Sequence, residues 1–242
     1  MKAFGLCLFL IVGGSVAFAN NTCESETQRC RELSRSRELR GVNFLPTVDQ
    51  LRDLCPKFFE FIECENELVR ACTGKSIEEV MTSSNRSLSQ YATEISDLGS
   101  LAADICDENS LLHTDFAASV ECIRDEVQLR RDHICRDTSL ITVETYLNSI
   151  KTNQDEDGSE KHLCLQISYA VACTIKRLEK TCGESARRAL VTIIERLHYL
   201  SNLGCTEKIA LDLRDFFESL TFDTEEEKRL YQSVFEMLAE GL

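Results

Sequence analysis

The chain has 242 residues and a formal net charge of −14 at pH 7, from 27 Lys and Arg against 41 Asp and Glu. This acidity argues against a protein that holds nucleic acid or an anionic membrane through a basic patch, because the phosphates would be repelled. Two prolines, ten glycines and no tryptophan are unlike a turn-rich β-sandwich, so the composition favours helices.

Residues 1–19 have the pattern of a secretory signal peptide. Lys2 precedes the apolar run AFGLCLFLIVGGSVAFA, which ends in the small-x-small motif of Ala17 and Ala19. A transmembrane anchor is the alternative, but the run is short and polar residues follow it directly. We therefore expect a secreted, extracellular protein without a membrane span, whose mature chain begins at Asn20.

Helices are predicted along the first part of the mature chain. The range 22–40 is expected to be a polar helix, and a capping box at Thr47 and Gln50 opens the next helix. Pro56 lies inside this second helix and should kink or break it, because proline removes a backbone donor. The apolar positions of the second helix are three and four residues apart, namely Leu51, Leu54, Phe58, Phe61 and Ile62.

The remaining elements are also expected to be helices. A capping box at Ser76 and Glu79 opens a region that should bend or stop near Gly99. Residues 107–109 form a gap, and the charged loop 151–160 is the best linker in the chain. Further helices are expected over 110–135, 140–150, 162–182 and 184–200, from Cys205 onward, and over 223–240 with a cap at Asp223 and Glu226. No segment alternates like a strand, so the expected fold is all-α.

One sequon, Asn85-Arg86-Ser87, lies on a polar, Ser-rich stretch. We expect Asn85 to be exposed and N-glycosylated in a secreted protein. A second sequon begins at Asn20, but its acceptor would be the first mature residue, and we therefore discount it.

Twelve of the thirteen cysteines remain once Cys7 is removed with the signal peptide. An even number in a secreted chain predicts disulfides, and the absence of any CxxC spacing argues against a zinc site. We expect a disulfide-stapled helical bundle that uses all twelve: Cys23, Cys30, Cys55, Cys64, Cys72, Cys106, Cys122, Cys135, Cys164, Cys173, Cys182 and Cys205.

The cysteine spacing favours two tandem repeats of six cysteines each. DLCPKFFEFIEC, which ends at Cys64, and HLCLQISYAVAC, which ends at Cys173, share apolar positions at helical spacing. We expect a first repeat over residues 20–108, a second over 109–222 and a separate amphipathic helix over 223–242. A single domain whose helices share a spacing by accident is the alternative.

The bridges themselves are not fixed by the sequence, because six cysteines allow fifteen pairings. An antiparallel hairpin turning near Asn43 would pair Cys30 with Cys55 and Cys23 with Cys64, and the fifth cysteine with the sixth. However, Cys55 and Cys64 are nine residues apart, half a turn out of phase on a straight helix. The alternative is a helix that is bridged to two different neighbours.

No motif in the sequence predicts a catalytic, cofactor or metal site. His133 and His162 each precede a framework cysteine by two residues, which favours surface histidines over metal ligands. His113 and His198 have no matching ligands near them in the sequence. HExxH, GxSxG and the phosphate-binding and dinucleotide-binding glycine patterns are all absent, so we expect a non-enzymatic protein without cofactor.

Two features favour binding. Phe59 falls outside the main apolar stripe of its helix and could line a cavity or a partner surface, although core packing is the commoner role of phenylalanine. The Phe-rich C-terminal region, with Phe216, Phe217, Phe222 and Phe235, includes a last helix beyond the final cysteine. That helix either docks on the core or binds a partner.

Two stretches of the sequence are similar to a known group of proteins. One is Phe44-Leu45-Pro46-Thr47 with Leu51, Leu54-Cys55, Cys64 and Cys72, and the other is Cys182-Gly183 with Ala186. Together they resemble poorly characterised cysteine-rich secreted proteins of arthropods and nematodes, some of them haemolymph or venom components. The resemblance implies an extracellular helical protein and supplies no catalytic residues.

These observations lead to one expected function and two alternatives. We expect a secreted, non-enzymatic protein that binds a hydrophobic ligand or a protein partner and no nucleic acid. A venom or secretory-gland effector that acts on a host receptor is the alternative. An enzyme of unfamiliar type is the least favoured.

Overall fold

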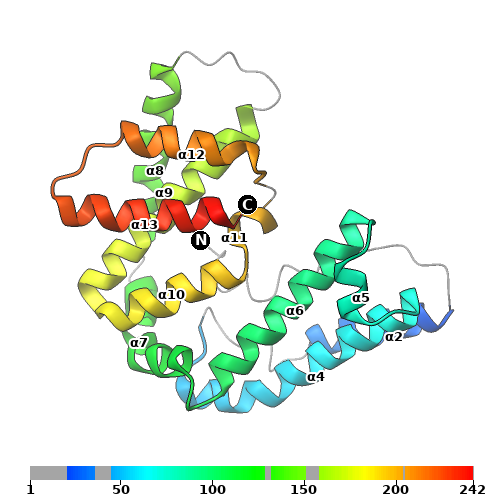
Figure 1. Cartoon of the computed structure of the whole chain (residues 1–242). Coiled ribbons are helices and arrows are strands. Elements are labelled where there is room, and N and C mark those ends of the chain that lie inside the picture. Colours follow the sequence, from blue (N-terminus) through cyan, green and yellow to red (C-terminus); the bar gives the residue numbers. More distant parts are fainter. Residues whose placement is uncertain (1–20, 36–44, 129–131, 151–157, 204, 242) are drawn as a thin grey trace. The chain divides into compact units, whose positions relative to one another are not determined.

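The structure is a computed structural model that describes residues 21–35, 45–128, 132–150, 158–203 and 205–241 (Figure 1). The expected signal peptide, the acceptor of the second sequon, most of the connector before Pro46 and most of the loop 151–160 lie outside these residues. Every regular element in the described part is a helix and none is a strand, so the all-α prediction is confirmed.

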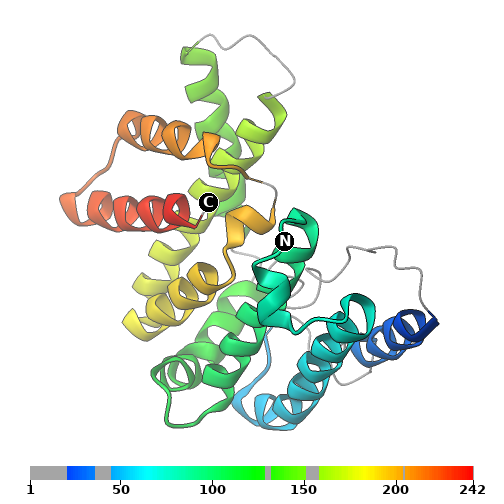
Figure 2. The ribbon, with the colours of Figure 1, turned by 45° about the vertical axis from the view of Figure 1, so that its right-hand side comes forward.

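Two compact units divide the chain between Val120 and Glu121. Unit 1 contains α2 (Asn21–Ser34), α4 (Val48–Thr73), α5 (Ile77–Met81), α6 (Arg86–Cys106) and the first part of α7 (Leu111–Gln128). Unit 2 contains the rest of α7, α8 (Asp132–Ser149), α9 (Gly158–Cys182), α10 (Glu184–Arg196), α11 (Tyr199–Asn202), α12 (Lys208–Ser219) and α13 (Glu225–Glu240) (Figure 2). The division falls later than the expected seam after residue 108, since Phe116 and Val120 of α7 pack with Leu51 of α4.

The central helix of unit 1 is α4, which lies beside both α2 and α6. Its three cysteines form the bridges Cys23–Cys72 and Cys30–Cys64 to α2 and Cys55–Cys106 to the end of α6. The hairpin pairing is therefore wrong. The alternative is confirmed, because cysteines half a turn apart on one helix can only reach neighbours on different sides of it.

Helix α4 continues through Pro56 as one element, so the expected break is not found. The proline ring is exposed, and buried Leu51 and Phe61 anchor the helix on either side of it. The capping box of Thr47 and Gln50 is present at the start of α4, as predicted.

The region that begins at Ser76 forms two helices instead of one. The capping box of Ser76 and Glu79 is present, but α5 ends at Met81. Asn85 then caps α6, and its side-chain oxygen accepts a hydrogen bond from the backbone N–H of Leu88 at 3.2 Å. The polar residues of the sequon thus start a new helix, as asparagine does readily at this position.

Gly99 does not end α6, which continues to Cys106. A Cβ atom at Gly99 would lie 3.2 Å from Cγ2 of Ile62 on α4, closer than ordinary contact. The glycine therefore allows the two helices to approach each other, and tertiary packing offsets its poor helix propensity.

The central helix of unit 2 is α9, which contacts α8, α10, α12 and α13. The bridges of unit 2 are Cys122–Cys182, Cys135–Cys173 and Cys164–Cys205. Cys135 lies within α8 and not at the end of the preceding helix, because α7 ends at Gln128 and α8 begins at Asp132. In both units the first cysteine bonds the fifth, the second bonds the fourth and the third bonds the sixth.

Three helix limits near the C-terminus differ from the predictions. The expected helix 184–200 is interrupted at His198, whose φ of 43° lies in the left-handed region. Helix α12 begins at Lys208, three residues after Cys205. The cap of α13 is Thr224, whose hydroxyl accepts from the N–H of Glu227 at 3.1 Å, so the cap at Asp223 was misplaced by one residue.

Helix α13 docks on the core of unit 2. Tyr231, Val234, Phe235 and Leu238 are buried on its inner side. Both views place α12 and α13 next to each other along α9 (Figures 1 and 2). Of the two roles considered for this helix, the structure shows the docked one.

Candidate functional site

The aromatic side chains near the C-terminus form one cluster inside unit 2. Tyr146 of α8 and Tyr169 of α9 contact Phe216 of α12 at ring-centroid distances of 5.1 and 6.3 Å. Phe216 also lies 6.0 Å from Phe235 of α13, and Tyr169 lies 5.6 Å from Tyr231. Rings at these distances fill the space between the helices, so this region is core.

Tyr231 and Phe217 extend the same cluster. Phe217 lies 5.5 Å from Phe222 and 5.8 Å from Phe235, and Phe222 lies 5.3 Å from Tyr231. Burial raises the pKa of the Tyr231 phenol, and its neighbour Tyr169 raises it further. The C-terminal phenylalanines that were candidates for binding therefore contact one another.

The phenylalanines of α4 divide between core and surface. Phe61 is buried, and the ring of Phe58 meets it edge to face at 6.4 Å. Phe59 is 44 % exposed. It is therefore a surface side chain of unit 1, whereas the C-terminal aromatic residues belong to unit 2.

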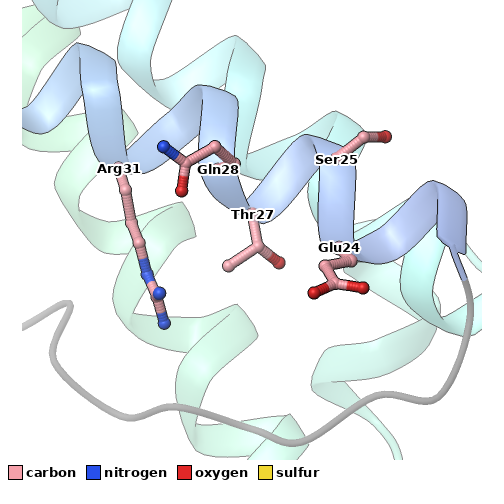
Figure 3. A pocket seen from close by; sticks show the side chains of 5 residues that line it. All are labelled: Glu24, Ser25, Thr27, Gln28 and Arg31. Atoms are coloured by element: carbon pink, nitrogen blue, oxygen red, sulfur yellow. The ribbon is translucent and has the colours of Figure 1, made fainter.

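A shallow hollow of about 450 Å³ lies against α2 and is shown in Figure 3. Its described lining is Glu24, Ser25, Thr27, Gln28 and Arg31. Glu24, Thr27 and Arg31 project to one side, whereas Ser25 points away from them (Figure 3). The hydroxyls of Ser25 and Thr27 donate to carbonyls of their own helix, at 2.9 and 2.7 Å. These polar groups are used locally and do not converge on a ligand.

The four histidines are dispersed. Nδ1 of His113 lies 2.7 Å from the carbonyl oxygen of Ile105, and Nε2 of His162 lies 3.0 Å from Nε2 of Gln166. His133 and His198 are exposed. Across the described ranges, no three His, Cys, Asp or Glu side chains are grouped so that they could hold a metal ion. The same ranges contain no helix with the length and apolarity to cross a membrane.

A buried polar pair, Glu65 of α4 with Tyr91 of α6, was not foreseen from the sequence. Glu65 is only 3 % exposed, and the hydroxyl of Tyr91 donates to its carboxylate. Burial raises the pKa of Glu65, and the hydrogen bond from Tyr91 opposes this effect. Burial also raises the pKa of Tyr91, to which the charge of Glu65 adds. The pair is enclosed between two helices, so its role is structural.

The position of Glu65 carried a signal in the sequence. It follows Phe58 and Phe61 at seven and four residues, which continues the apolar stripe of α4 with a carboxylate. A charged residue on a stripe of this kind requires a buried partner.

The most exposed apolar side chains of α8 lie on one face, which we call the Ile–Thr face. It consists of Ile134, Thr138, Ile141 and Thr145, and all four are exposed. Ile134 is 55 % and Ile141 is 68 % exposed. Their spacing of four, seven and eleven residues places them on one side of a helix.

The apolar character of the Ile–Thr face comes from its two isoleucines, and one of its two threonines uses its hydroxyl within the helix. The hydroxyl of Thr145 donates to the carbonyl oxygen of Ile141 at 2.7 Å, so its hydrogen bond is made within α8. Asp137 and Glu144 supply exposed charge beside the face. The sequence signal was the repeated Ile and Thr at helical spacing, which was not recognised as a surface feature.

The rest of α8 shows why this face is left uncovered. Cys135, Ser139 and Val143 form the buried side of the helix, and Cys135 bonds Cys173 of α9. The bridge fixes which side of α8 meets α9, so the Ile–Thr face lies away from the α9 contact.

In the described part of the chain, the geometry thus offers the convex Ile–Thr face of α8, and the contacts described above include no convergence of catalytic side chains. The resemblance to cysteine-rich secreted proteins of arthropods and nematodes stays a prediction. Comparison of the chain with known protein families, with curated proteins and with solved structures finds no match.

Proposed function

We propose that this is a secreted, non-enzymatic protein that binds another protein through the Ile–Thr face of α8. The observation that carries the proposal is the exposure of Ile134 and Ile141 on a helix that a disulfide holds in place. Solvent-exposed isoleucines at helical spacing are costly to hydrate, and such surfaces are typical of protein interaction sites.

The shape of the face favours a protein partner over a small hydrophobic ligand. Small molecules bind in concave sites that cover most of their surface, whereas one helix presents a convex ridge. The aromatic cluster around Phe216 is packed ring against ring, so these rings occupy space between the C-terminal helices where a carried ligand could lie. We therefore prefer the protein partner among the two that were expected.

The expected partner offers an apolar groove that receives a helix. Ile134 and Ile141 are seven residues apart, which is about 10 Å along a helix axis. Two anchors at this spacing, with a smaller residue between them, match the helix-in-groove mode of recognition. The charges of Asp137 and Glu144 lie beside the anchors, where they would form a polar rim.

The disulfides support an extracellular site of action. Six bridges lie within the described residues, and such bridges persist in oxidising compartments. The signal-peptide pattern of residues 1–19 agrees with this placement. Because each bridge restricts the unfolded chain, a stapled scaffold also presents its surface helices with little loss of entropy on binding.

We further propose that units 1 and 2 are tandem copies of one six-cysteine module. The support is the shared bridge order, first to fifth, second to fourth and third to sixth, on helices with the same Cys-x8-Cys register. A chain of residues 121–242 alone should then form its three bridges in this order, as mapped by peptide mass analysis. Scrambled bridges in that chain would contradict an independent module.

Partner binding is tested by changing the face without changing the fold. We expect the mature protein to enrich a specific partner from the extracellular fluid of its source, and Ile134→Glu with Ile141→Glu to abolish that enrichment. Leu211→Glu is the matched control, because Leu211 is 61 % exposed on α12 of the same unit. Equal enrichment by wild type and the double variant would contradict the proposal.

Two further measurements separate the remaining possibilities. A fluorescent fatty-acid probe that binds the mature protein, and that other lipids displace, would favour a carrier over the proposed function. Sedimentation of the purified protein tests whether the partner is a second copy of this chain, in which case the double variant becomes monomeric while Leu211→Glu does not.

A further inference from the structure

The sequon begins in the turn between α5 and α6 and continues into the first two residues of α6, and the structure describes all three of its residues. Asn85, Arg86 and Ser87 are exposed. The acceptor asparagine comes just before the first residue of α6, so its side chain lies at the helix end and not along the helix.

In the side-chain amide of Asn85, the oxygen is engaged in a hydrogen bond with a described residue and the nitrogen is not. Its Oδ1 accepts from the N–H of Leu88 at 3.2 Å, and its backbone N–H donates to the hydroxyl of Ser83 at 3.2 Å. Its Nδ2 has no partner among the described residues. The oxygen therefore caps α6, whereas the nitrogen remains available for chemistry.

N-glycosylation takes place at Nδ2, the side-chain nitrogen of Asn85 that has no hydrogen bond to a described residue. The Nδ2 of asparagine attacks the anomeric carbon of a lipid-linked oligosaccharide and forms an N–C bond. The bond from that carbon to the lipid pyrophosphate breaks, the lipid pyrophosphate leaves, and the amide loses one proton to a base. The product is still an amide, so Oδ1 remains an acceptor.

We propose that Asn85 carries an N-linked glycan and, through the same side chain, still caps α6. This inference rests on the secretion proposed above, because the donor oligosaccharide is found in the secretory pathway. It also assigns the turn between α5 and α6 as a surface that the glycan covers, which leaves this turn unavailable to a protein partner.

Two substitutions of Ser87 test the glycan without touching the cap. The full chain is expressed in a eukaryotic secretory cell, and both cell-associated and secreted protein are analysed by intact mass before and after N-glycosidase treatment. We expect a glycosidase-sensitive mass on wild type and on Ser87→Thr, which keeps the sequon, and none on Ser87→Ala. No sensitive mass on wild type, or its persistence in Ser87→Ala, overturns the inference.

The second sequon supplies the positional control. Asn20→Gln should keep the sensitive mass, and glycosidase treatment in heavy-oxygen water should label residue 85 as it converts the acceptor to aspartate. Label at residue 20 alone would overturn the assignment.

The double role of Asn85 is tested by thermal unfolding of glycan-free forms. Asn85→Asp removes the sequon and keeps a capping oxygen, so its Tm should equal that of Ser87→Ala. Asn85→Ala removes both, so its Tm should be lower than either. Equal Tm values for all three would remove the capping half of the proposal.

A chain with a different, proven secretory leader distinguishes failure of the glycan from failure of secretion. If the chain with the substituted leader is glycosylated at Asn85 and the native chain is not, the assignment of Asn85 as acceptor is retained and the native leader does not direct secretion. If it is secreted and still unglycosylated, the glycan inference is overturned and the proposed secretion is unaffected.

Discussion

Helices α4 and α9 are the central helices of the two units. They bury different faces, although their cysteines have the same spacing and the same bonding order. Cys55 and Cys64 of α4 have the same spacing as Cys164 and Cys173 of α9, and each pair bonds the same members of its set. The similarity of the two helices ends there, because the side chains between the cysteines meet different surroundings.

The face of α9 that contains Leu165 and Ala172 is covered by α12 and α13. Lys161 pairs with Asp212 of α12, and Lys176 pairs with Glu227 of α13, at the two ends of this face. Leu165, Ser168 and Ala172 between them are fully buried. The cover thus consists of the two helices that follow the last cysteine.

The corresponding face of α4 is exposed to solvent. The positions that match Lys161, Leu165, Ser168 and Ala172 by cysteine register are Arg52, Pro56, Phe59 and Glu63, and all four are exposed. The comparison teaches that the disulfides select which helices are neighbours. Burial of a face depends instead on which further helices the chain places against it.

The largest expected effect comes from truncating a buried side chain on α9. Leu165→Ala should lower the free energy of unfolding by about 2–5 kcal/mol, because Leu165 is completely buried and a cavity would remain. Pro56→Ala, at the matching position of α4, should not destabilise the protein, since Pro56 is exposed and alanine is the better helix former. Denaturant titration of both variants measures the difference, and equal losses would break the comparison.

The next largest effect is the dependence of stability on pH, which arises from Glu65 in unit 1. The pKa of Glu65 is raised in the folded protein by burial, so folding favours the protonated carboxyl. This contribution to stability is fully present below the pKa that Glu65 has in the unfolded chain. It is lost as the pH rises through the pKa that Glu65 has in the folded protein. Glu65→Gln, which keeps an acceptor for Tyr91, should therefore be more stable than wild type at neutral pH and should show a flatter dependence on pH.

Unit 2 provides the control for this pH effect. The residue that matches Glu65 by cysteine register is Thr174, whose hydroxyl donates to the carbonyl oxygen of Ala170 at 2.7 Å. Thr174→Ser should leave the pH dependence unchanged in thermal unfolding between pH 4 and 8. An unchanged profile in Glu65→Gln would show that the buried pair does not titrate as described.

The smallest expected effect is the order in which the bridges are reduced. The sulfurs of Cys30–Cys64 and Cys164–Cys205 belong to buried residues, whereas both cysteines of Cys55–Cys106 and of Cys122–Cys182 are half-buried. A reductant reaches exposed sulfurs first. Partial reduction followed by alkylation and mass mapping should find the two half-buried bridges opened first, one in each unit. Early opening of Cys30–Cys64 would contradict this order.

The sequence predicted those elements that depend on local chemistry. The capping boxes at Thr47 and Ser76 were correctly located, because a cap needs only residues within one turn. The all-α class followed from the absence of alternating segments. Participation of the twelve cysteines also followed from their number, since the redox compartment does not depend on the fold.

The features that were missed depend on contacts between distant residues. Pro56 and Gly99 both lie in continuous helices, because tertiary packing overrides their local preference. The bridge order required knowledge of which helices flank α4. The Ile–Thr face could not be recognised because Ile134 and Ile141 are equally compatible with a core stripe until the neighbours of α8 are known.

The bridge order also determines which cuts in the backbone would release a fragment. In unit 1, Cys23–Cys72 and Cys55–Cys106 overlap, so any single cut between residues 23 and 106 leaves two pieces that remain covalently joined. In unit 2, Cys122–Cys182 and Cys164–Cys205 overlap in the same way and enclose the loop 151–160. Cuts before Cys23, between residues 106 and 122, where Glu108 and Asn109 are exposed, or beyond Cys205 are spanned by none of these bridges and would separate parts of the protein.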